Sequence, residues 1–275
     1  MWTLSGFADE ISPDLDEQCR VMVQLGFGYV EFRSAWETNV LELDDRGVDR
    51  VSTTLEEHGL RVSSIGSPIG KIGVQDDFDG HLRLFDRALH VAEVLAAPYI
   101  RLFSFFLPPD DDPATHRDEV LRRMAALAER AQGHEVVLVH ENEKHIYGDS
   151  PQRCLDIVRG VGSAQLKLAW DAANFVQCGF HPHTDGYSAL RPYLEYMQIK
   201  DALFASGEMV PAGEGDGEIR ETLRALHADG FTGFFSLEPH LATAGSFGGF
   251  SGPDLFSAAH QAFTGLLVAE GIEYR

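Results

Sequence analysis

The sequence predicts an α/β protein built as a single (β/α)8 TIM barrel. Eight short β-rich runs alternate with helical patterns, and successive runs begin 25 to 37 residues apart. A step of that size fits one strand, one loop and one crossover helix. No long linker interrupts the series, so we expect one domain over residues 1–275. A doubly wound open sheet is the alternative, and eight units of even length favour the closed barrel.

The expected strands are runs rich in β-branched, aromatic and other apolar residues. The fourth run, YIRLFSFF, reaches Phe106 and carries Arg101. Even the apolar part of this run is far shorter than the roughly 18 residues that a membrane-spanning helix needs. In chain order, the eight runs begin near Leu4, Tyr29, Val62, Tyr99, Glu135, Leu166, Tyr196 and Gly233.

Capping residues mark the helices expected between these strands. The clearest signal is Ser150 followed by Pro151, an N-cap residue followed by proline at the first helical position. The helix around Ser188 to Tyr193 is expected to be short, because Gly, His and Pro are common near it. Other helix starts are expected at Pro13-Asp14, at Asp79-Gly80, at Gly217-Glu218 and at Pro253.

Composition excludes several classes of protein. With 44% hydrophobic and 24% charged residues, the chain has the composition of a globular protein. Its formal net charge of −21 argues against nucleic acid or an anionic membrane as partner, because phosphates require a cationic face. Cys19, Cys154 and Cys178 are widely spaced, which is typical of a reduced protein, and the start of the chain lacks the basic and apolar signature of a signal peptide. We therefore expect a cytoplasmic protein without a membrane anchor, and assembly into a homo-oligomer stays open.

Polar and charged side chains lie where most of the expected strands end. Strands of a parallel sheet are usually apolar, and barrel enzymes carry their functional groups at the carboxyl ends of the strands. The clearest indication of a functional site is a set of three carboxylates at the ends of the fifth, sixth and eighth strands: Glu141, Asp171 and Glu238. Three ionised carboxylates at one place repel each other, so either a proton or a cation must hold them. We expect one divalent metal ion, although each carboxylate alone could instead cap a helix or pair with a nearby Arg or Lys.

Five segments carry a resemblance to a known family: HEN (140–142), WDAAN (170–174), QIKD (198–201), GEGDG (213–217) and SLEPH (236–240). With GFADEIS near the start, they resemble the sugar phosphate isomerase/epimerase family of xylose isomerase-like barrels over nearly the whole chain. The resemblance implies one metal ion bound by Glu, Asp, His and Glu on strands five to eight. By that pattern Glu141, Asp171 and Glu238 are ligands, and Gln198 stands where the family has histidine.

The glutamine affects which metal is expected. Its side-chain oxygen would complete an all-oxygen site, which favours Mg²⁺ or Mn²⁺ and weakens binding, whereas a nitrogen ligand would favour Zn²⁺ or Co²⁺. We expect Gln198 to be the fourth ligand. A water molecule, His183 or His240 in that position is the alternative.

The implied activity is that of a metal-dependent isomerase or epimerase of a sugar, keto-polyol or related polyhydroxy carbonyl compound. Such a reaction begins with removal of a proton next to the carbonyl and passes through an enediolate, which a metal ion stabilises. In the ketose 3-epimerases of this family the two ligand glutamates exchange that proton, which implies Glu141 and Glu238 as the catalytic pair. Expected substrate contacts at the other strand ends are Glu31, Arg33, Lys71, Arg101, Asn174, Lys200, Glu214 and His240.

Other functions on the same scaffold stay open. A lyase that dehydrates a keto-inositol or keto-sugar would begin with the same proton abstraction and use the same metal site. A non-catalytic sugar-binding subunit is a further alternative, suggested by Gln198 in place of histidine. An endonuclease of this fold would need a histidine-rich metal site and a basic face, and the net charge of −21 argues against it.

Overall fold

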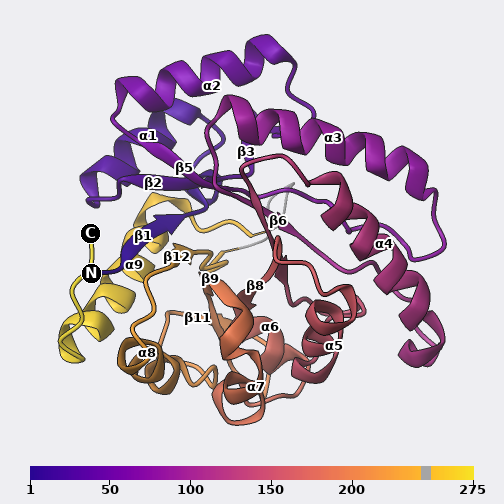
Figure 1. Cartoon of the computed structure of the whole chain (residues 1–275). Helices are drawn as coiled ribbons and strands as arrows, with labels where there is room; N and C mark the ends of the chain where they lie inside the picture. Colours follow the sequence, from indigo (N-terminus) through magenta and orange to yellow (C-terminus); the bar gives the residue numbers. More distant parts are fainter. Residues whose placement is uncertain (243–248) are drawn as a thin grey trace.

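Eight parallel strands form the centre of the molecule, and helices surround them (Figure 1). The computed structural model describes residues 1–242 and 249–275. The strands join in the order β1-β12-β9-β8-β7-β6-β5-β2, and β1 also contacts β2, so the barrel is nearly closed. The predicted fold is thus confirmed. The strands are β1 (Thr3–Gly6), β2 (Tyr29–Phe32), β5 (Arg61–Ile65), β6 (Tyr99–Leu102), β7 (Val137–Glu141), β8 (Leu166–Asp171), β9 (Leu194–Ile199) and β12 (Phe234–Leu237).

Several helices that cover the barrel, α1, α2, α3, α5 and α6, begin at a residue whose side chain accepts a capping hydrogen bond. Ser150 accepts a hydrogen bond from the backbone N–H of Arg153, as its position before Pro151 predicts. The helix expected at Asp79-Gly80 begins one residue earlier, at Phe78, because Asp77 is its N-cap. The helices are α1 (Leu15–Gln24), α2 (Asp45–Glu57), α3 (Phe78–Val94), α4 (Arg117–Arg130), α5 (Pro151–Val161), α6 (Ala172–Gln177), α7 (Ser188–Leu190), α8 (Ile219–Ala228) and α9 (Gly252–Ala269).

Two short hairpins extend the strand ends at the mouth, and the sequence patterns did not predict them. The hairpin of β3 (Ser34–Ala35) and β4 (Thr38–Asn39) follows β2, and that of β10 (Asp201–Ala202) and β11 (Met209–Val210) follows β9. The fourth expected strand is also shorter than predicted, because β6 ends at Leu102. Phe106 instead forms isolated bridges with Gly73 and Ile146.

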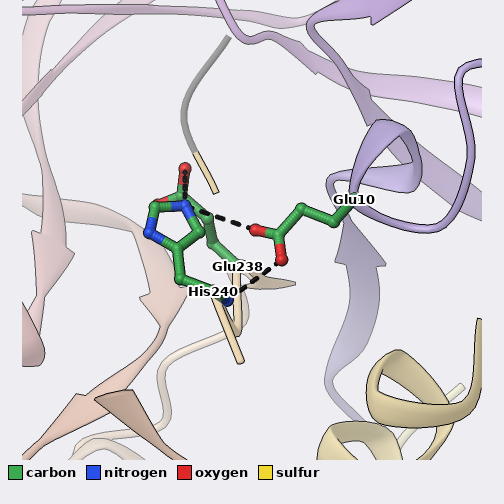
Figure 2. A group of neighbouring side chains, drawn as sticks. All are labelled: Glu10, Glu238 and His240. Atoms are coloured by element: carbon green, nitrogen blue, oxygen red, sulfur yellow. Dashed lines mark hydrogen bonds and ion pairs between the residues drawn. The ribbon is translucent and has the colours of Figure 1, made fainter. Parts of the chain in front are cut away.

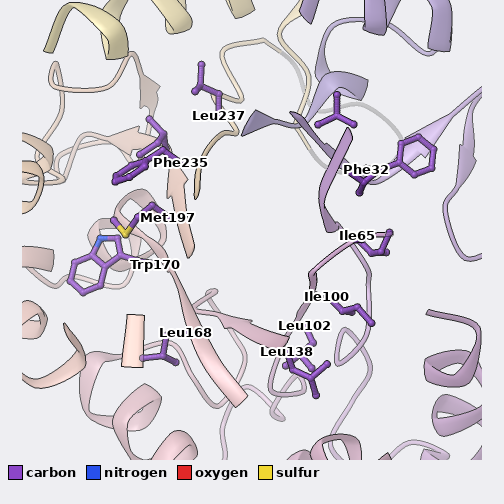
Figure 3. Close-up of a cluster of buried hydrophobic side chains, with 14 of the residues drawn as sticks. Phe32, Ile65, Ile100, Leu102, Leu138, Leu168, Trp170, Met197, Phe235 and Leu237 are labelled. Carbon is purple, nitrogen blue, oxygen red and sulfur yellow. The ribbon is translucent and has the colours of Figure 1, made fainter. Parts of the chain in front are cut away.

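Alternation along the strands separates an apolar outer face from a polar inner face. The outward side chains pack under the helices and form the main core, which Figure 3 shows. Val139, Ala169 and Tyr196 form a small apolar cluster inside the barrel. Beyond it, along the same strands, the inward positions turn polar, so the barrel itself places charged groups at its carboxyl end. The outward residues labelled in Figure 3 are Phe32, Ile65, Ile100, Leu102, Leu138, Leu168, Trp170, Met197, Phe235 and Leu237.

Over the described residues, none of the helices combines the length and the apolar character needed to cross a membrane.

Candidate active site at the carboxyl ends of the strands

The three carboxylates expected at the mouth lie together. Glu141 is the last residue of β7, Asp171 is the last residue of β8, and Glu238 directly follows β12. One oxygen from each lies within 4.8 Å of the others, and all three side chains are buried. Residues nearly a hundred positions apart in the chain meet because adjacent parallel strands end at the same rim.

Side-chain cations are already in contact with this cluster. Nζ of Lys200 lies 2.7 Å from Oδ2 of Asp171 and 3.0 Å from Oε2 of Glu238. Arg101 donates to Oε2 of Glu141 at 3.0 Å and lies 3.5 Å from Oε1 of Glu238. The repulsion that the sequence implied is therefore relieved at least in part by the chain's own cations.

Burial and these cations give the three carboxyls different affinities for a proton. Burial raises the pKa of Glu141 to about 8, and Arg101 only partly offsets that effect. Burial raises the pKa of Asp171 to about 6, against the opposing charge of Lys200. Burial would also raise the pKa of Glu238, but Lys200 and further cationic neighbours outweigh it and hold that pKa well below its usual range. Lys200 stays an ammonium, because Asp171 and Glu238 raise its pKa although burial would lower it.

Arg33 links the cluster to the first strand. Its guanidinium forms two hydrogen bonds to Asp9, at 2.8 and 3.1 Å, and a third to Oε1 of Glu238 at 3.1 Å. Both Arg33 and Arg101 also lie over the ring of Phe7, at 4.4 and 4.7 Å from its centroid. These contacts fix the two guanidinium groups at the mouth, where they face the carboxylates.

Gln198 lies beside Asp171 in the register of β8 and β9, and its amide faces into the barrel. Its Nε2 donates to both oxygens of Glu31, at 3.2 and 3.0 Å. Glu31 is fully buried, and burial raises its pKa although Arg101 opposes this. Oε1 of Gln198 is buried and has no hydrogen-bond partner among the described residues. Its role as a ligand stays a prediction.

Two asparagines hold the carboxylates in place. Nδ2 of Asn174 lies 3.3 Å from Oε1 of Glu141, and the backbone N–H of Asn174 donates to Oδ1 of Asp171, which caps α6. Asn142 exchanges two hydrogen bonds with the backbone of Asp171, at 2.8 and 2.9 Å. Sequence reasoning selected Asn174 but not Asn142 as a site residue, although Asn142 directly follows Glu141 in the HEN segment.

Two other predicted contacts lie nearer the surface. Nζ of Lys71 is 3.4 Å from Oε2 of Glu143 and 4.2 Å from the centroid of the Phe103 ring. Glu214 is exposed in a turn, and the glycines around it instead donate backbone N–H groups to Asp201. The GEGDG segment thus anchors its own loop, and the contact of Glu214 with substrate stays a prediction.

A second group of metal-type ligands, Glu10, Glu238 and His240, shares Glu238 with the first cluster, and Figure 2 shows its three side chains. Nε2 of His240 is 3.3 Å from Oε1 of Glu10 and 3.4 Å from Oε1 of Glu238. Burial raises the pKa of Glu10 to about 8 and lowers that of His240. Sequence reasoning did not select Asp9 or Glu10, although both follow the first strand as the other candidates follow theirs.

The donors at the first cluster suit a hard divalent cation. Oxygen ligands at about 2.0–2.6 Å from one ion can lie up to roughly 4–5 Å apart, and the carboxylate oxygens here are within 4.8 Å. The unpartnered Oε1 of Gln198 is a fourth oxygen donor on the neighbouring strand. Lys200 contacts two of the same carboxylates, so an ion and this ammonium would compete for them.

Comparison with known proteins places the chain among proteins of this fold. The sequence model of a family described as "Xylose isomerase-like TIM barrel" matches residues 19–261. The chain is 23% identical over 146 residues to a probable L-ribulose-5-phosphate 3-epimerase, UlaE, from Mycoplasma pneumoniae. That alignment covers 53% of this chain and 48% of the relative, so the chain spans about half the length of the curated relative that it matches.

Two solved structures of similar fold are informative. A xylose isomerase-like TIM barrel protein from Mycobacterium smegmatis, in complex with magnesium, is 21% identical with a TM-score of 0.72, over 98% of this chain and 97% of that one. The probable 3-DHS dehydratase AsbF of petrobactin synthesis from Bacillus anthracis is 20% identical with a TM-score of 0.74, over 96% and 98% of the two chains. At these identities the likeness shows the fold alone.

Proposed function

The chain belongs to the xylose isomerase-like TIM barrel family, and from that premise we propose that it is a divalent-metal-dependent isomerase or epimerase. Its substrate would be a sugar, a keto-polyol or a related polyhydroxy carbonyl compound. The observation that carries the proposal is the buried cluster of Glu141, Asp171 and Glu238, whose oxygens lie within 4.8 Å at the barrel mouth. The similarity to a probable sugar-phosphate epimerase supports the same class of reaction.

Glu141, Asp171 and Glu238 would hold the ion, with Gln198 as the fourth ligand. When bound, a divalent ion supplies Lewis acidity that polarises a carbonyl and the hydroxyl beside it. The all-oxygen donor set favours Mg²⁺ or Mn²⁺, and Zn²⁺ or Co²⁺ would bind if a nitrogen ligand joined it. The magnesium in a protein of the same fold agrees with that preference.

Glu141 and Glu238 would act as the acid/base pair. Glu141 ends β7 and Glu238 follows β12, with β8 and β9 between them in the sheet, so a substrate bound over the mouth would have the two carboxyls approach from different strands. One carboxylate takes the proton from the carbon next to the carbonyl, which leaves an enediolate in the substrate, and the other carboxyl returns a proton. Return to the neighbouring carbon moves the carbonyl, and return to the opposite face of the same carbon inverts that centre.

The remaining polar groups would orient the hydroxyls of the substrate. Arg33, Arg101 and Lys200 are buried cations whose donors already face Glu238. Glu31 and Asn174 lie next to the same groups, and Lys71, Glu214 and His240 are proposed as outer contacts. Such donors and acceptors suit a polyhydroxyl compound, including a sugar acid.

Metal-stripped protein tests the proposal. We would add Mn²⁺ or Mg²⁺ and incubate with ketoses, inososes and their phosphates in D₂O. The expected result is deuterium uptake next to the carbonyl, dependent on metal and accompanied by an isomer or epimer. Absence of exchange with every compound, although the ion binds, would overturn the enzyme proposal in favour of a sugar-binding role.

A lyase is the second candidate, favoured by the shared fold of the probable 3-DHS dehydratase. Loss of water from the same enediolate would require only that a hydroxyl on the next carbon leaves. Product analysis distinguishes the two outcomes, because a dehydratase gives an unsaturated product that is lighter by one water molecule, whereas an isomerase or epimerase preserves the mass.

A further inference from the structure

One carboxyl and one imidazole at the mouth have unused ligand atoms. Glu10 ends the short 3-10 helix η1 (Ala8–Glu10) after β1 and has no exposed surface. Its Oε1 is buried without a hydrogen-bond partner among residues 1–242 and 249–275, and so is Nε2 of His240. Figure 2 shows both atoms directed toward each other and toward Glu238.

The spacing of these atoms fits metal ligands better than hydrogen bonds. Nε2 of His240 is 3.3 Å from Oε1 of Glu10 and 3.4 Å from Oε1 of Glu238. A charge-assisted hydrogen bond would be shorter, at about 2.7–2.9 Å. Ligands about 2.0–2.1 Å from a tetrahedral ion are separated by roughly 3.3–3.4 Å, the edge of the tetrahedron.

The chain also holds these ligand atoms in position. Oε2 of Glu10 accepts hydrogen bonds from the backbone N–H of His240 at 3.0 Å and from Oγ of Ser251 at 2.8 Å, which turns Oε1 toward the imidazole. Gly249 lies against the imidazole, and a Cβ at that position would overlap the ring. The space that the ring occupies therefore depends on a glycine.

Glu238 connects this group to the first cluster. Its Oε2 faces Lys200, while its Oε1 faces His240, Arg33 and Arg101. Arg101 also donates to Glu141, whose charge balances it. The carboxylate of Asp9, which accepts two hydrogen bonds from Arg33, balances the positive charge of that guanidinium. The two oxygens of one carboxylate can thus serve neighbouring cations.

We propose that Glu10, Glu238 and His240 form a second cation site, selective for a borderline divalent ion such as Zn²⁺ or Co²⁺, and that Glu238 bridges it to the cluster of Glu141 and Asp171. The imidazole nitrogen gives this site a preference for the later transition metals, whereas the first cluster offers oxygen donors alone. The mouth would then hold two ions of different character. This inference concerns binding and does not depend on the proposed reaction.

The test counts zinc ions in the full chain. Metal-stripped protein is dialysed against Zn²⁺ alone, and bound zinc per chain is measured by mass spectrometry of the metal. We expect two ions in the unsubstituted protein and one fewer in Glu10→Gln and in His240→Asn, with at least hundredfold weaker binding at the lost site. Asp171→Asn should lose the ion of the first cluster and keep that of the second site. The double variant Asp171→Asn/His240→Asn should therefore bind no ion. Ser257→Ala removes a hydroxyl that donates to the carbonyl of Pro253 at the start of α9, outside the proposed site, so it is the control and should keep both ions.

A second measurement needs no variant to fold. In the proton NMR spectrum of the Co²⁺-loaded unsubstituted protein, the exchangeable N–H proton of an imidazole that binds the paramagnetic ion is strongly shifted. We expect one such signal. Its absence, or an unchanged zinc count in folded Glu10→Gln and His240→Asn, would overturn the second site. If zinc binds at His240 while Asp171→Asn loses no ion, the second site stands and the metal of the proposed function fails.

Discussion

Lys200 and Asp171 form a fully buried ion pair at the point where a metal ion is expected, with Nζ 2.7 Å from Oδ2. The same ammonium reaches Oε2 of Glu238 at 3.0 Å. A lysine ammonium is a compact point charge, so it can neutralise the carboxylates that would otherwise attract a divalent ion. Metal affinity at the first cluster should therefore be set by competition with a side chain of the protein itself.

Replacing Lys200 by methionine should strengthen metal binding. The substitution keeps the length and apolar stem of the side chain and removes the competing charge, so we expect at least tenfold tighter Mn²⁺ binding, about 1.4 kcal/mol or more. Calorimetric titration of the metal-stripped proteins measures the change. Lys71→Met is the matched control, because Lys71 pairs with Glu143 and lies outside the cluster, and it should change affinity far less. Weaker or equal binding in Lys200→Met would show that the ammonium does not compete.

Glu141→Gln and Glu238→Gln should each lower turnover more than a hundredfold. A positioned general acid or base contributes about 10²–10⁴-fold, and glutamine keeps the shape while removing the proton-transfer group. Deuterium exchange from solvent into the substrate is measured together with metal content and circular dichroism. If a variant that retains metal still exchanges deuterium at the unsubstituted rate, that glutamate is not the base.

Gln198→His should change which metal binds. The imidazole could keep one N–H donor toward Glu31 and present its other nitrogen to the cluster, so Zn²⁺ and Co²⁺ should gain affinity relative to Mg²⁺. Parallel titrations with the three metals measure the ratio. Gln198→Glu is a useful comparison, because it keeps oxygen donors and should not favour zinc to the same degree. Unchanged affinities for all metals in both variants would place residue 198 outside the coordination shell.

Much of the barrel could be predicted because its signal is local and repeated. Each strand is a short apolar run, and caps such as Ser150 and Asp14 mark helix starts, so the eight strands begin within two residues of the predicted positions. The same periodicity, with function expected at the strand ends, is enough to predict that Glu141, Asp171 and Glu238 lie together. The hairpins of β3–β4 and β10–β11 were missed because two-residue strands carry no periodic signal.

The partners of the site residues could not be read from the sequence. Whether Lys200 approaches Asp171 or a substrate depends on side-chain directions across three strands. Glu10 was overlooked because its partner His240 is separated from it by 230 residues, and their contact arises only where β1 and β12 pair. The sequence likewise predicted Glu214 of GEGDG as a substrate contact, but it could not show that Asp201 anchors that loop, because the two segments meet only in the folded chain.

Asp201→Asn should loosen the seventh loop. Oδ1 accepts from the backbone N–H groups of Ala202 and Gly217, and Oδ2 accepts from those of Gly213 and Gly215. When an amide nitrogen replaces one of the two carboxylate oxygens, two of these hydrogen bonds are lost. The amide N–H groups then face backbone N–H groups, and neither can accept. We expect a loss of about 2–4 kcal/mol in the free energy of unfolding, measured in urea, with faster hydrogen exchange in residues 211–218.

Asp216→Asn is the matched control for that experiment. Asp216 lies in the same loop but is exposed, and it accepts one hydrogen bond, from the backbone N–H of Phe204. Its substitution should cost less than about 1 kcal/mol. Equal losses in the two variants would mean that Asp201 is not the main anchor of the loop.

His81 connects the pH dependence of stability to the loop that carries Lys71. Nε2 of His81, on α3, accepts a hydrogen bond from the backbone N–H of Gly70 at 2.8 Å. Gly70 has a φ of +88°, and a Cβ there would collide with the backbone of Phe103, so the turn depends on glycine and on this bond. Burial, assisted by the charge of Arg123, lowers the pKa of His81 below its ordinary value of 6.5.

The sign of the pH effect follows from that lowered pKa. Below about pH 6.5 the unfolded chain binds a proton at His81 that the folded chain resists, so stability from this group is present above pH 6.5 and lost as the pH falls. The loss cannot exceed about 1.4 kcal/mol per pH unit for one group. Urea unfolding of the unsubstituted protein and of His81→Gln at pH 7.5, 6.5 and 5.5 isolates it, because glutamine can still accept from Gly70 but does not titrate. The difference in stability between the two proteins should shift in favour of His81→Gln as the pH falls, and a difference that stays constant would show that His81 titrates alike in both states.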